Sequence, residues 1–416
     1  MLRLTSPLAL PLAALGVLWS SCASAAPRPE PVTAAPPALS LAETAPVETS
    51  LDQPDWPDAG AVWVEMIDGA ARQLDIAQFY VTSAPGERME PILEAIARAG
   101  ARGVAVRVLL DAKFTKQYPE DIARLVALPG VTVVTWDAGA TLGGILHAKY
   151  FVVDGREAWL GSQNFDWRSL AHILELGVRV RVPEVVAGLS EVFDTDWALA
   201  TGTRSDAGRP ANAAGPSPTA RTSYGGAPAV VRLALSPTGW LPDERTWDLP
   251  QLVDLIDHAR TRVRTQMLSY ETTHRDEPPF TTLDDALRRA AGRGVAVELL
   301  VSHWNLRGER LAALASLAGV PGITVRFVVL PEASGGFIPF ARTIHAKTMT
   351  VDGRVGWIGT SNWGRGYFHE SRNVGLIVES GAFTADLDRF FGTAWDSPYA
   401  ETLVPGRTYP EPRVAK

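Results

Sequence analysis

The sequence predicts an α/β protein made of two similar lobes, each a mixed sheet flanked by helices, related by an approximate twofold axis. The 416 residues are 46% hydrophobic and 20% charged, which is ample for a large buried core and excludes a disordered or fibrous chain. Helical patterns end near glycine and are followed by continuous apolar runs, as expected for strands buried on both faces. This arrangement occurs twice, which predicts two lobes.

The repeat begins with a helix and a strand in each copy. A helical pattern over residues 91–99 precedes the apolar run 104–110, and a second pattern over 283–291 precedes the run 295–300. A helix, a glycine stop and a buried strand in this order are typical of α/β folds.

The later part of the repeat is nearly identical in its key positions. Residues 147–155 (HAKYFVVDG) return as residues 345–353 (HAKTMTVDG). The spacing between matching residues grows from 191, between Arg102 and Arg293, to 198 here, which places extra residues of the second copy near 331–342. A period of about 195 residues is too long for a solenoid.

The first 25 residues are typical of an export signal. Arg3 is the sole positive charge, residues 8–18 are apolar, and a small-residue cleavage site follows. We therefore expect a periplasmic or extracellular protein. Cys22 is the only cysteine, so the mature chain has no disulfide. Lipid anchoring through Cys22 is an alternative, although Trp19 stands where lipoprotein signals usually carry Leu.

Composition sets the expected domain boundaries. No later run reaches the roughly 18 apolar residues of a membrane helix, so the mature chain is expected to lack a transmembrane segment. The predicted organisation is a signal peptide at 1–25, a disordered Pro- and Ala-rich tether at 26–50, a first lobe at 51–200, a linker at 201–228, a second lobe at 229–405 and a tail at 406–416.

Each copy carries an H-x-K-x4-D-G motif followed by Gly-[Ser/Thr]-x-Asn. Asp-Gly at 154–155 and 352–353 predicts hairpin turns, and side-chain alternation around them places four polar residues of each copy on one face. These residues are His147, Lys149, Ser162 and Asn164 in the first copy, and His345, Lys347, Thr360 and Asn362 in the second. Asp154 and Asp352 lie at the turns, where we expect structural hydrogen bonds.

This set of side chains suits a phosphate. The net charge of −7 provides no global positive field, so an anion site must be local. Two of only five lysines fall in the motifs, and a compact ammonium suits a reacting phosphate. A lysine two residues from each histidine would repel a metal ion, so we expect no metal and no cofactor. A neutral imidazole can attack phosphorus while a cationic one protonates the leaving alkoxide.

These motifs resemble those of the phospholipase D superfamily, whose duplicated H-x-K-x4-D pattern is intact here over roughly residues 55–400. The flanking segments are similar to the branch that contains animal lysosomal 5′-exonucleases and poxvirus envelope proteins; they are residues 74–80, 161–170 with 175–178, 359–363 with 367–368, and 395–399. The resemblance implies two phospholipase D-like lobes with the active site between them.

The resemblance also implies roles for individual residues. His147 would be the nucleophile and His345 the general acid. Glu175 and Glu370 would orient the imidazoles and raise their basicity. The phosphate would be bound by Lys149, Lys347, Asn164 and Asn362, and by Ser162 and Thr360 on the same face. The animal members have disulfides, which this chain cannot form.

The implied activity is that of a secreted, metal-independent phosphodiesterase that works through a covalent phosphohistidine. Its substrate would be the 5′ end of a single-stranded nucleic acid or a phospholipid head group, with peripheral membrane contact if the substrate is a lipid. The resemblance leaves open a phospholipid transphosphatidylase, a cardiolipin-synthase-like transferase and a non-catalytic lipid-binding envelope protein. Since one chain supplies both half-sites, a monomer suffices for activity, and a dimer is not excluded.

The remaining histidines and several aromatic residues have plainer interpretations. His172, His258 and His274 are expected to be exposed or satisfied. His303 and His369 are intermediate cases, and a surface role is favoured for His303. Four aromatic residues follow the Gly-[Ser/Thr]-x-Asn segments and could stack on bases, contact an acyl chain or pack in the core. They are Trp167, Trp363, Tyr367 and Phe368.

Overall fold

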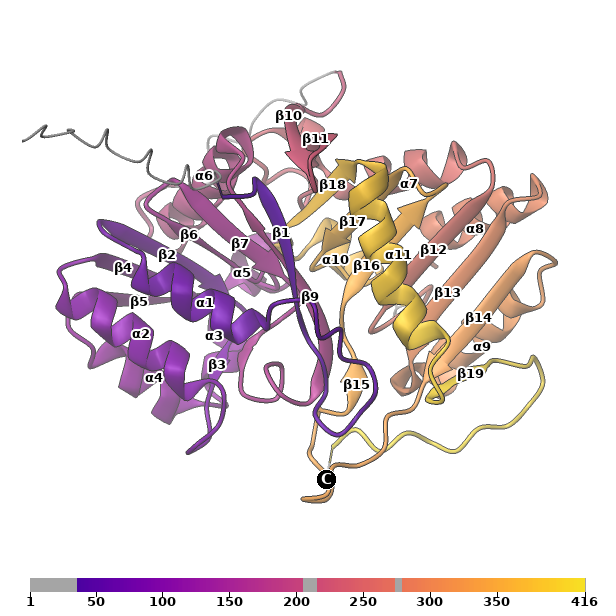
Figure 1. Ribbon diagram of the computed structural model, residues 1–416, viewed down its shortest axis with the longest axis horizontal. Coiled ribbons are helices and arrows are strands. Elements are labelled where there is room, and N and C mark those ends of the chain that lie inside the picture. Colours follow the sequence, from indigo (N-terminus) through magenta and orange to yellow (C-terminus); the bar gives the residue numbers. More distant parts are fainter. Residues whose placement is uncertain (1–35, 205–214, 274–278, 416) are drawn as a thin grey trace, which may run out of the picture. The chain divides into compact units, whose positions relative to one another are not determined.

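The structure is a computed structural model that describes residues 36–204, 215–273 and 279–415. The predicted signal peptide, Cys22 and His274 lie outside these residues. Within the described ranges, no helix is both long and apolar enough to cross a membrane. The chain from residue 37 onward forms one compact unit with two large sheets and helices on their faces (Figure 1).

The first sheet has eight strands in which a parallel part continues into an antiparallel part. Its main path runs through β1 (Leu39–Thr44), β9 (Ile173–Val180), β7 (Glu157–Gly161), β6 (Tyr150–Val153), β2 (Gln73–Gln78), β4 (Ala105–Asp111) and β5 (Val131–Trp136). Strands β2, β4 and β5 are parallel, as the buried apolar runs and intervening helices predict. A short parallel pair, β3 (Val81–Thr82) and β8 (Phe165–Asp166), lies apart from it.

The second sheet repeats this plan with nine strands. Its order is β10 (Ala220–Tyr224), β11 (Ala227–Leu233), β18 (Gly375–Glu379), β17 (Val355–Gly359), β16 (Lys347–Val351), β12 (Arg262–Met267), β13 (Ala296–Ser302), β14 (Ile323–Val328) and β19 (Ala400–Thr402). Strands β12, β13 and β14 are parallel. The β6–β7 hairpin corresponds to the β16–β17 hairpin, in which Met349 opposite Trp357 matches Phe151 opposite Trp159.

Helices cover both faces of the sheets because each has one apolar stripe to bury. The first half contains α1 (Ala59–Asp68), α2 (Glu90–Ala101), α3 (Ala112–Thr115), α4 (Pro119–Val126), α5 (Ala138–Leu142) and α6 (Pro183–Ala200). The second contains α7 (Asp248–Asp257), α8 (Thr282–Gly292), α9 (Gly308–Ala318), α10 (Arg365–His369) and α11 (Gly381–Trp395), with 3₁₀ turns at Glu244–Thr246 and His303–Asn305.

Three apolar cores hold these layers together. Helices α1 and α2 form one core with the first sheet, and α7, α8 and α9 form another with the second. The third core joins the halves, since it contains Leu189 and Phe193 of α6, Leu387 and Phe390 of α11, and inward residues of both sheets. The α/β class and the duplicated architecture predicted from the sequence are present.

Two predicted boundaries are wrong where edge strands form. Strand β1 lies within the predicted disordered tether 26–50 and pairs antiparallel with β9. Strand β10 and the start of β11 lie within the predicted linker 201–228 and extend the second sheet. Such strands take their order from a neighbouring strand rather than from the surrounding composition, which is rich in Pro, Ala and Gly.

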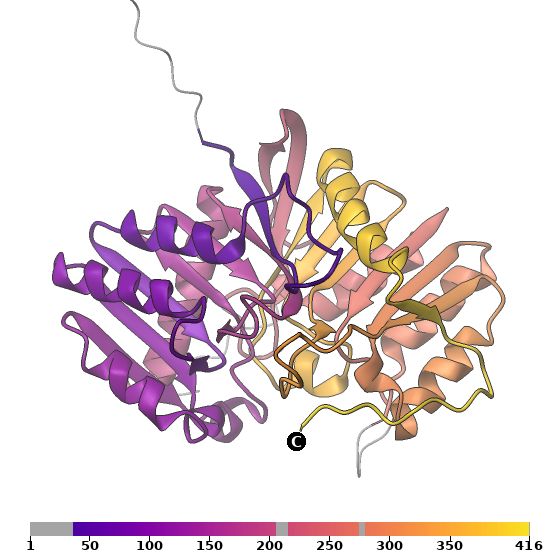
Figure 2. The same ribbon diagram turned by 60° about the horizontal axis from the view of Figure 1, so that its bottom comes forward.

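The second half also reaches into the first through one short strand. Strand β15 (Thr343–Ile344), which leads into His345, pairs parallel with β9 of the first sheet. The C-terminal segment, yellow in Figure 2, runs along the second half towards the insertion at 331–342, where the Phe340 amide donates to the Val414 carbonyl at 2.8 Å. The histidine of the second motif is therefore positioned by both halves.

Candidate active site

The backbone of each motif histidine is held by a strand segment of the opposite half. The His147 amide donates to the Arg372 carbonyl at 3.0 Å, and the His345 amide donates to the Leu174 carbonyl at 2.9 Å. Both histidine side chains are buried. The two copies of the motif therefore meet across the contact between the halves.

The two lysines have equivalent environments. Lys149 Nζ donates to the carbonyl of His147 at 2.5 Å, and Lys347 Nζ donates to the carbonyl of His345 at 2.5 Å. Burial lowers the pKa of Lys347 to about 7. Burial and then the charge of Lys347 place the pKa of Lys149 well below its usual value. A phosphate bound between these ammonium groups would favour their charged forms.

The two imidazoles differ in the group that holds Nδ1. Glu175 Oε2 lies 2.8 Å from Nδ1 of His345, whereas Asn373 Oδ1 lies 2.9 Å from Nδ1 of His147. Residue 373 follows residue 175 by 198 positions, the same spacing that separates the two motif histidines. Asn373 is thus the repeat counterpart of Glu175, and each contacts the histidine of the other copy.

The prediction that Glu370 orients an imidazole is wrong. Its carboxylate pairs with the guanidinium of Arg365 instead. Asn373 occupies the position predicted for Glu370. The 198-residue spacing would have identified Asn373 from the sequence, but an amide does not stand out when a carboxylate is expected.

The charges around the site lower the pKa of the two histidines unequally. Burial, followed by the charges of Lys149 and Lys347, places the pKa of His147 well below 6.5. Burial also lowers the pKa of His345, but the Glu175 carboxylate opposes this shift. Burial would raise the pKa of Glu175, yet His345 and Lys347 outweigh it and keep this carboxyl group ionised. The geometry therefore favours a neutral His147 and a more readily protonated His345.

The predicted phosphate-binding face contains two kinds of residue. Asn164 and Asn362 are buried, and Oδ1 of Asn164 has no hydrogen-bond partner within the described part of the chain. Ser162 Oγ instead donates to the Leu176 carbonyl at 3.2 Å, and Thr360 Oγ1 donates to Oδ1 of Asn373 at 2.9 Å. Both hydroxyl groups therefore donate to acceptors within the protein, and their assignment to phosphate stays a prediction.

The motif aspartates hold the start of a neighbouring strand. Asp154 Oδ1 accepts from the amides of Arg72 at 2.7 Å and Gln73 at 2.9 Å. Asp352 Oδ1 accepts from the amides of Thr261 at 2.7 Å and Arg262 at 3.0 Å. Burial would raise the pKa of both carboxyl groups, but these backbone donors outweigh it and lower the pKa.

A buried ion pair near the site was absent from the sequence-based predictions. The side chains of Arg372 and Asp196 are fully buried and lie 2.8 Å apart. Asp196 belongs to α6 of the first half, and Arg372 precedes Asn373 in the second. The pair therefore fixes the segment that holds both the amide and the ring of His147. An Arg and an Asp 176 positions apart give no local sequence signal.

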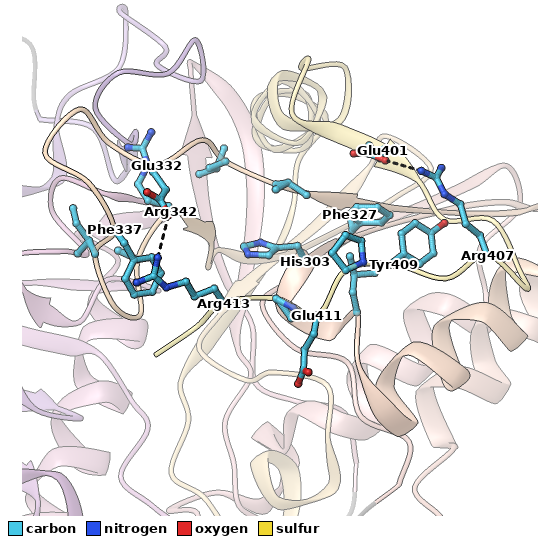
Figure 3. A pocket seen from close by; sticks show the side chains of 17 residues that line it. His303, Phe327, Glu332, Phe337, Arg342, Glu401, Arg407, Tyr409, Glu411 and Arg413 are labelled. Carbon is cyan, nitrogen blue, oxygen red and sulfur yellow. Dashed lines mark ion pairs between the residues drawn. The ribbon is translucent and has the colours of Figure 1, made fainter. Parts of the chain in front are cut away.

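The other histidines that the structure describes lie away from the pair. His258 is exposed, His172 packs on Trp167, and His369 packs on Trp247. The fourth, His303, lines a separate cavity of about 420 Å³ near the carboxyl ends of β13 and β14. Figure 3 shows His303 among the lining residues, with Arg413 beside Phe337.

The aromatic residues after the Asn positions have different environments. Trp363 and Phe368 are buried in the core that α7, α8 and α9 form with the second sheet, which agrees with the alternative of core packing. Trp167 is partly buried against the core that α1 and α2 form with the first sheet. The Tyr367 ring lies 5.0 Å from the His147 ring, between centroids. Only Tyr367 of these four therefore contacts a motif histidine.

Sequence comparison agrees with this geometry. The family described as "Cardiolipin synthase, PLD-like domain" matches residues 63–197 and 252–395, one segment in each half. The chain therefore belongs to the phospholipase D superfamily, and the predicted family is confirmed.

Individual relatives match most of the chain. Phospholipase D Z from Dictyostelium discoideum is 33% identical over 359 residues, which cover 81% of this chain and 85% of that protein. The 5'-3' exonuclease PLD3 of Bos taurus is 33% identical over 382 residues, 83% of this chain and 76% of that protein. Together with the family match, these relatives identify the chain as a phosphodiesterase hydrolase.

A solved structure has the same fold at low sequence identity. Phosphatidylserine synthase from Haemophilus influenzae is 13% identical and superposes with a TM-score of 0.59, covering 83% of this chain and 85% of that one. The predicted fold class is thereby confirmed.

Proposed function

We propose that this protein is an exported, metal-independent phosphodiesterase that forms a covalent phosphohistidine at His147. The observation that carries the proposal is the difference between the two Nδ1 partners. Asn373 Nδ2 donates to the carbonyls of Tyr367 at 2.8 Å and Ser371 at 3.1 Å, so its Oδ1 acts as the acceptor. Nδ1 of His147 must then carry the proton, which leaves the Nε2 lone pair for attack on phosphorus.

His345 is the proposed general acid. A carboxylate at Nδ1 stabilises the imidazolium form, so Nε2 of His345 can hold the proton that the leaving group needs. In the first step, the bond from His147 Nε2 to phosphorus forms, the phosphorus–alkoxide bond breaks, and the proton of His345 moves to the alkoxide oxygen. In the second step, water attacks phosphorus while His345 accepts its proton, and the phosphorus–nitrogen bond breaks.

The lysines and asparagines are proposed to bind the non-bridging oxygens. Lys149 and Lys347 supply positive charge, and Asn164 and Asn362 supply neutral amide donors. Each lysine donates one N–H to the backbone carbonyl of the histidine in its own motif. Two N–H donors of each ammonium group remain for phosphate. Charge and donors are thus in place once the phosphate is bound, so no metal ion is required.

The substrate is proposed to be a phosphodiester at the end of a single-stranded nucleic acid or in a phospholipid head group. The names of the exonuclease and phospholipase relatives support both. Transfer to an alcohol in place of water is the second candidate activity, because the phosphohistidine step is common to both. Intact His, Lys and Asn in both copies argue against a non-catalytic lipid-binding protein.

A paired assay tests the proposal. The purified chain is incubated with excess EDTA and either a 5′-hydroxyl oligonucleotide or phosphatidylcholine with ethanol. Cleavage of at least one substrate, unaffected by EDTA, is expected. A requirement for a divalent metal, or cleavage of neither substrate, would contradict the proposal. Phosphatidylethanol as the main lipid product would identify the transferase activity.

A further inference from the structure

A row of aromatic rings extends from His147 along the carboxyl ends of β2 and β4. Phe79 and Tyr80 follow β2, Phe114 lies on α3 after β4, and Tyr118 precedes α4. The Phe79 and Phe114 centroids are 4.0 Å apart, and the Tyr80 and Tyr118 centroids are 5.3 Å apart. All four side chains are partly exposed. They contact each other but do not belong to the three main cores.

This row is adjacent to the reacting groups. The Phe79 centroid lies 5.3 Å from that of the His147 ring and 5.0 Å from Lys149 Nζ. Asp111 fixes the position of Phe114, since its Oδ1 accepts from the Lys113 amide at 2.9 Å and caps α3. Its Oδ2 accepts from the amide of Leu146 at 2.7 Å, one residue before His147. One buried carboxyl group thus holds the rings in place beside the histidine.

The cations around the row indicate what can bind there. Lys113 and Lys116 are exposed at α3, and with Lys149 they make three of the five lysines in the chain. The Nζ of Lys113 lies 6.0 Å from the Phe114 centroid. These ammonium groups would repel a quaternary ammonium head group, which also prefers aromatic faces. Neutral nucleobases can stack on the rings, and their phosphates can pair with the lysines.

We propose that the row formed by Phe79, Tyr80, Phe114 and Tyr118 is a stacking surface for nucleobases next to the scissile phosphate, with Lys113 and Lys116 binding adjacent phosphates. This inference rests on the proposed phosphodiesterase function and assigns its substrate class as single-stranded nucleic acid. Phe79 positions the base nearest His147. Phe114 extends the surface away from the reacting phosphorus.

The stacking surface is tested by removing bases from the substrate and, separately, an aromatic ring from the protein. The substrates are a 5′-hydroxyl oligonucleotide and the same strand with abasic residues on both sides of the first phosphodiester. Alanine substitution at a stacking position costs about 5- to 150-fold per base, so the native enzyme should cleave the intact strand at least about 5-fold more efficiently, measured as kcat/KM. In Phe114→Ala this preference should fall to about 2-fold or less, whereas Phe114→Trp should keep it.

A matched control uses Phe340→Ala, which removes an exposed phenylalanine of the insertion at 331–342. This variant should keep the native preference for the intact strand. Equal cleavage of both strands by the native enzyme, or an unchanged preference in Phe114→Ala, overturns the stacking surface and leaves the phosphodiesterase proposal standing. Cleavage of phosphatidylcholine alone also overturns it. Failure of the native enzyme on every phosphodiester would instead refute the proposed function.

Salt dependence tests the lysines separately. Each phosphate contact contributes about −0.7 to the slope of log affinity against log salt for single strands. The Lys113→Ala/Lys116→Ala double variant should therefore reduce the magnitude of the slope of log(kcat/KM) by about 1.4 if kcat/KM follows binding. An unchanged slope would overturn their assignment to phosphates.

Discussion

At the scale of residues, the two motif histidines differ mainly in one partner group. The Glu175 carboxylate contacts Nδ1 of His345, and the Asn373 amide contacts Nδ1 of His147. An amide fixes a tautomer without stabilising a cation, whereas a carboxylate does both. This difference divides the proposed roles of nucleophile and acid between two otherwise similar half-sites.

Glu175→Gln tests this division. The substitution keeps a polar group on the His345 ring but removes the charge that raises the pKa of His345. A general acid must be protonated, so activity is lost as pH rises through its pKa. The alkaline limb of kcat against pH should therefore move to lower pH, and kcat at pH 7 should fall by about 100-fold or more.

Asn373→Asp is the matched variant with the opposite expected effect. A carboxylate on His147 would raise its pKa, and a protonated nucleophile cannot attack. The acid limb of the same profile should move to higher pH while the alkaline limb stays in place. If neither limb moves in either variant, the histidines do not have the proposed roles.

The sequence alone predicted most residues of the candidate site, since the duplicated motif brings both histidines and lysines to one place. It could not predict that the hydroxyl groups of Ser162 and Thr360 donate to acceptors within the protein, because alternation gives the face of a side chain but not its partner. Asn373 was not predicted because the family resemblance implied a second carboxylate. The pairing of Arg372 with Asp196 could not be predicted because it depends on how the halves meet.

At the scale of elements, each hairpin packs a tryptophan over glycine backbone. A Cβ at Gly177 would lie 2.1 Å from the ring of Trp159, and one at Gly359 would lie 2.8 Å from the ring of Trp357. These glycines, one in β9 and one in β17, let the strands of the two sheets pack under large buried rings. Each copy of the repeat thus contains a contact between a tryptophan ring and a glycine as well as the polar motif residues.

Gly177→Ala should destabilise the protein by about 1–3 kcal/mol, because the added methyl group must displace a fully buried indole. Chemical denaturation measures the change in the free energy of unfolding. The control is Gly292→Ala at the end of α8, where an added Cβ meets no atom within 4 Å. That variant should be neutral or slightly stabilising. Equal stability of the two variants would contradict the packing argument.

The elements best predicted from the sequence are those with continuous apolar runs, such as β4 and β13. The missed elements, β1 and β10, are edge strands in Pro- and Ala-rich sequence. Their hydrogen bonds come from β9 and β11, so local composition does not specify them.

At the scale of the whole molecule, the two halves complete each other's site. The Arg372 carbonyl accepts from the His147 amide, and the Leu174 carbonyl accepts from the His345 amide. The buried pair of Arg372 with Asp196 ties these contacts to α6. Neither half therefore contains a complete histidine environment of its own.

Asp196→Ala should lower the free energy of unfolding by about 3–5 kcal/mol, because it leaves a buried guanidinium without its counter-charge. The matched control is Asp68→Ala, which removes an exposed partner of Arg98 and should cost about 1 kcal/mol or less. Chemical denaturation of both variants gives the comparison. A loss at position 196 no larger than that at position 68 would show that the pair does not hold the halves together.

The central claim is that His147 forms the covalent bond to phosphorus, and His345→Ala tests it most directly. With a p-nitrophenyl phosphodiester, the leaving phenolate needs no proton, so His147 of the variant can still attack phosphorus. Hydrolysis of the resulting phosphohistidine lacks the base that His345 would supply, so the adduct should accumulate. After rapid quenching at alkaline pH and digestion, mass spectrometry should find the phosphoryl adduct on the peptide that contains His147. An adduct on another residue, or turnover with no adduct in His345→Ala, would contradict the account.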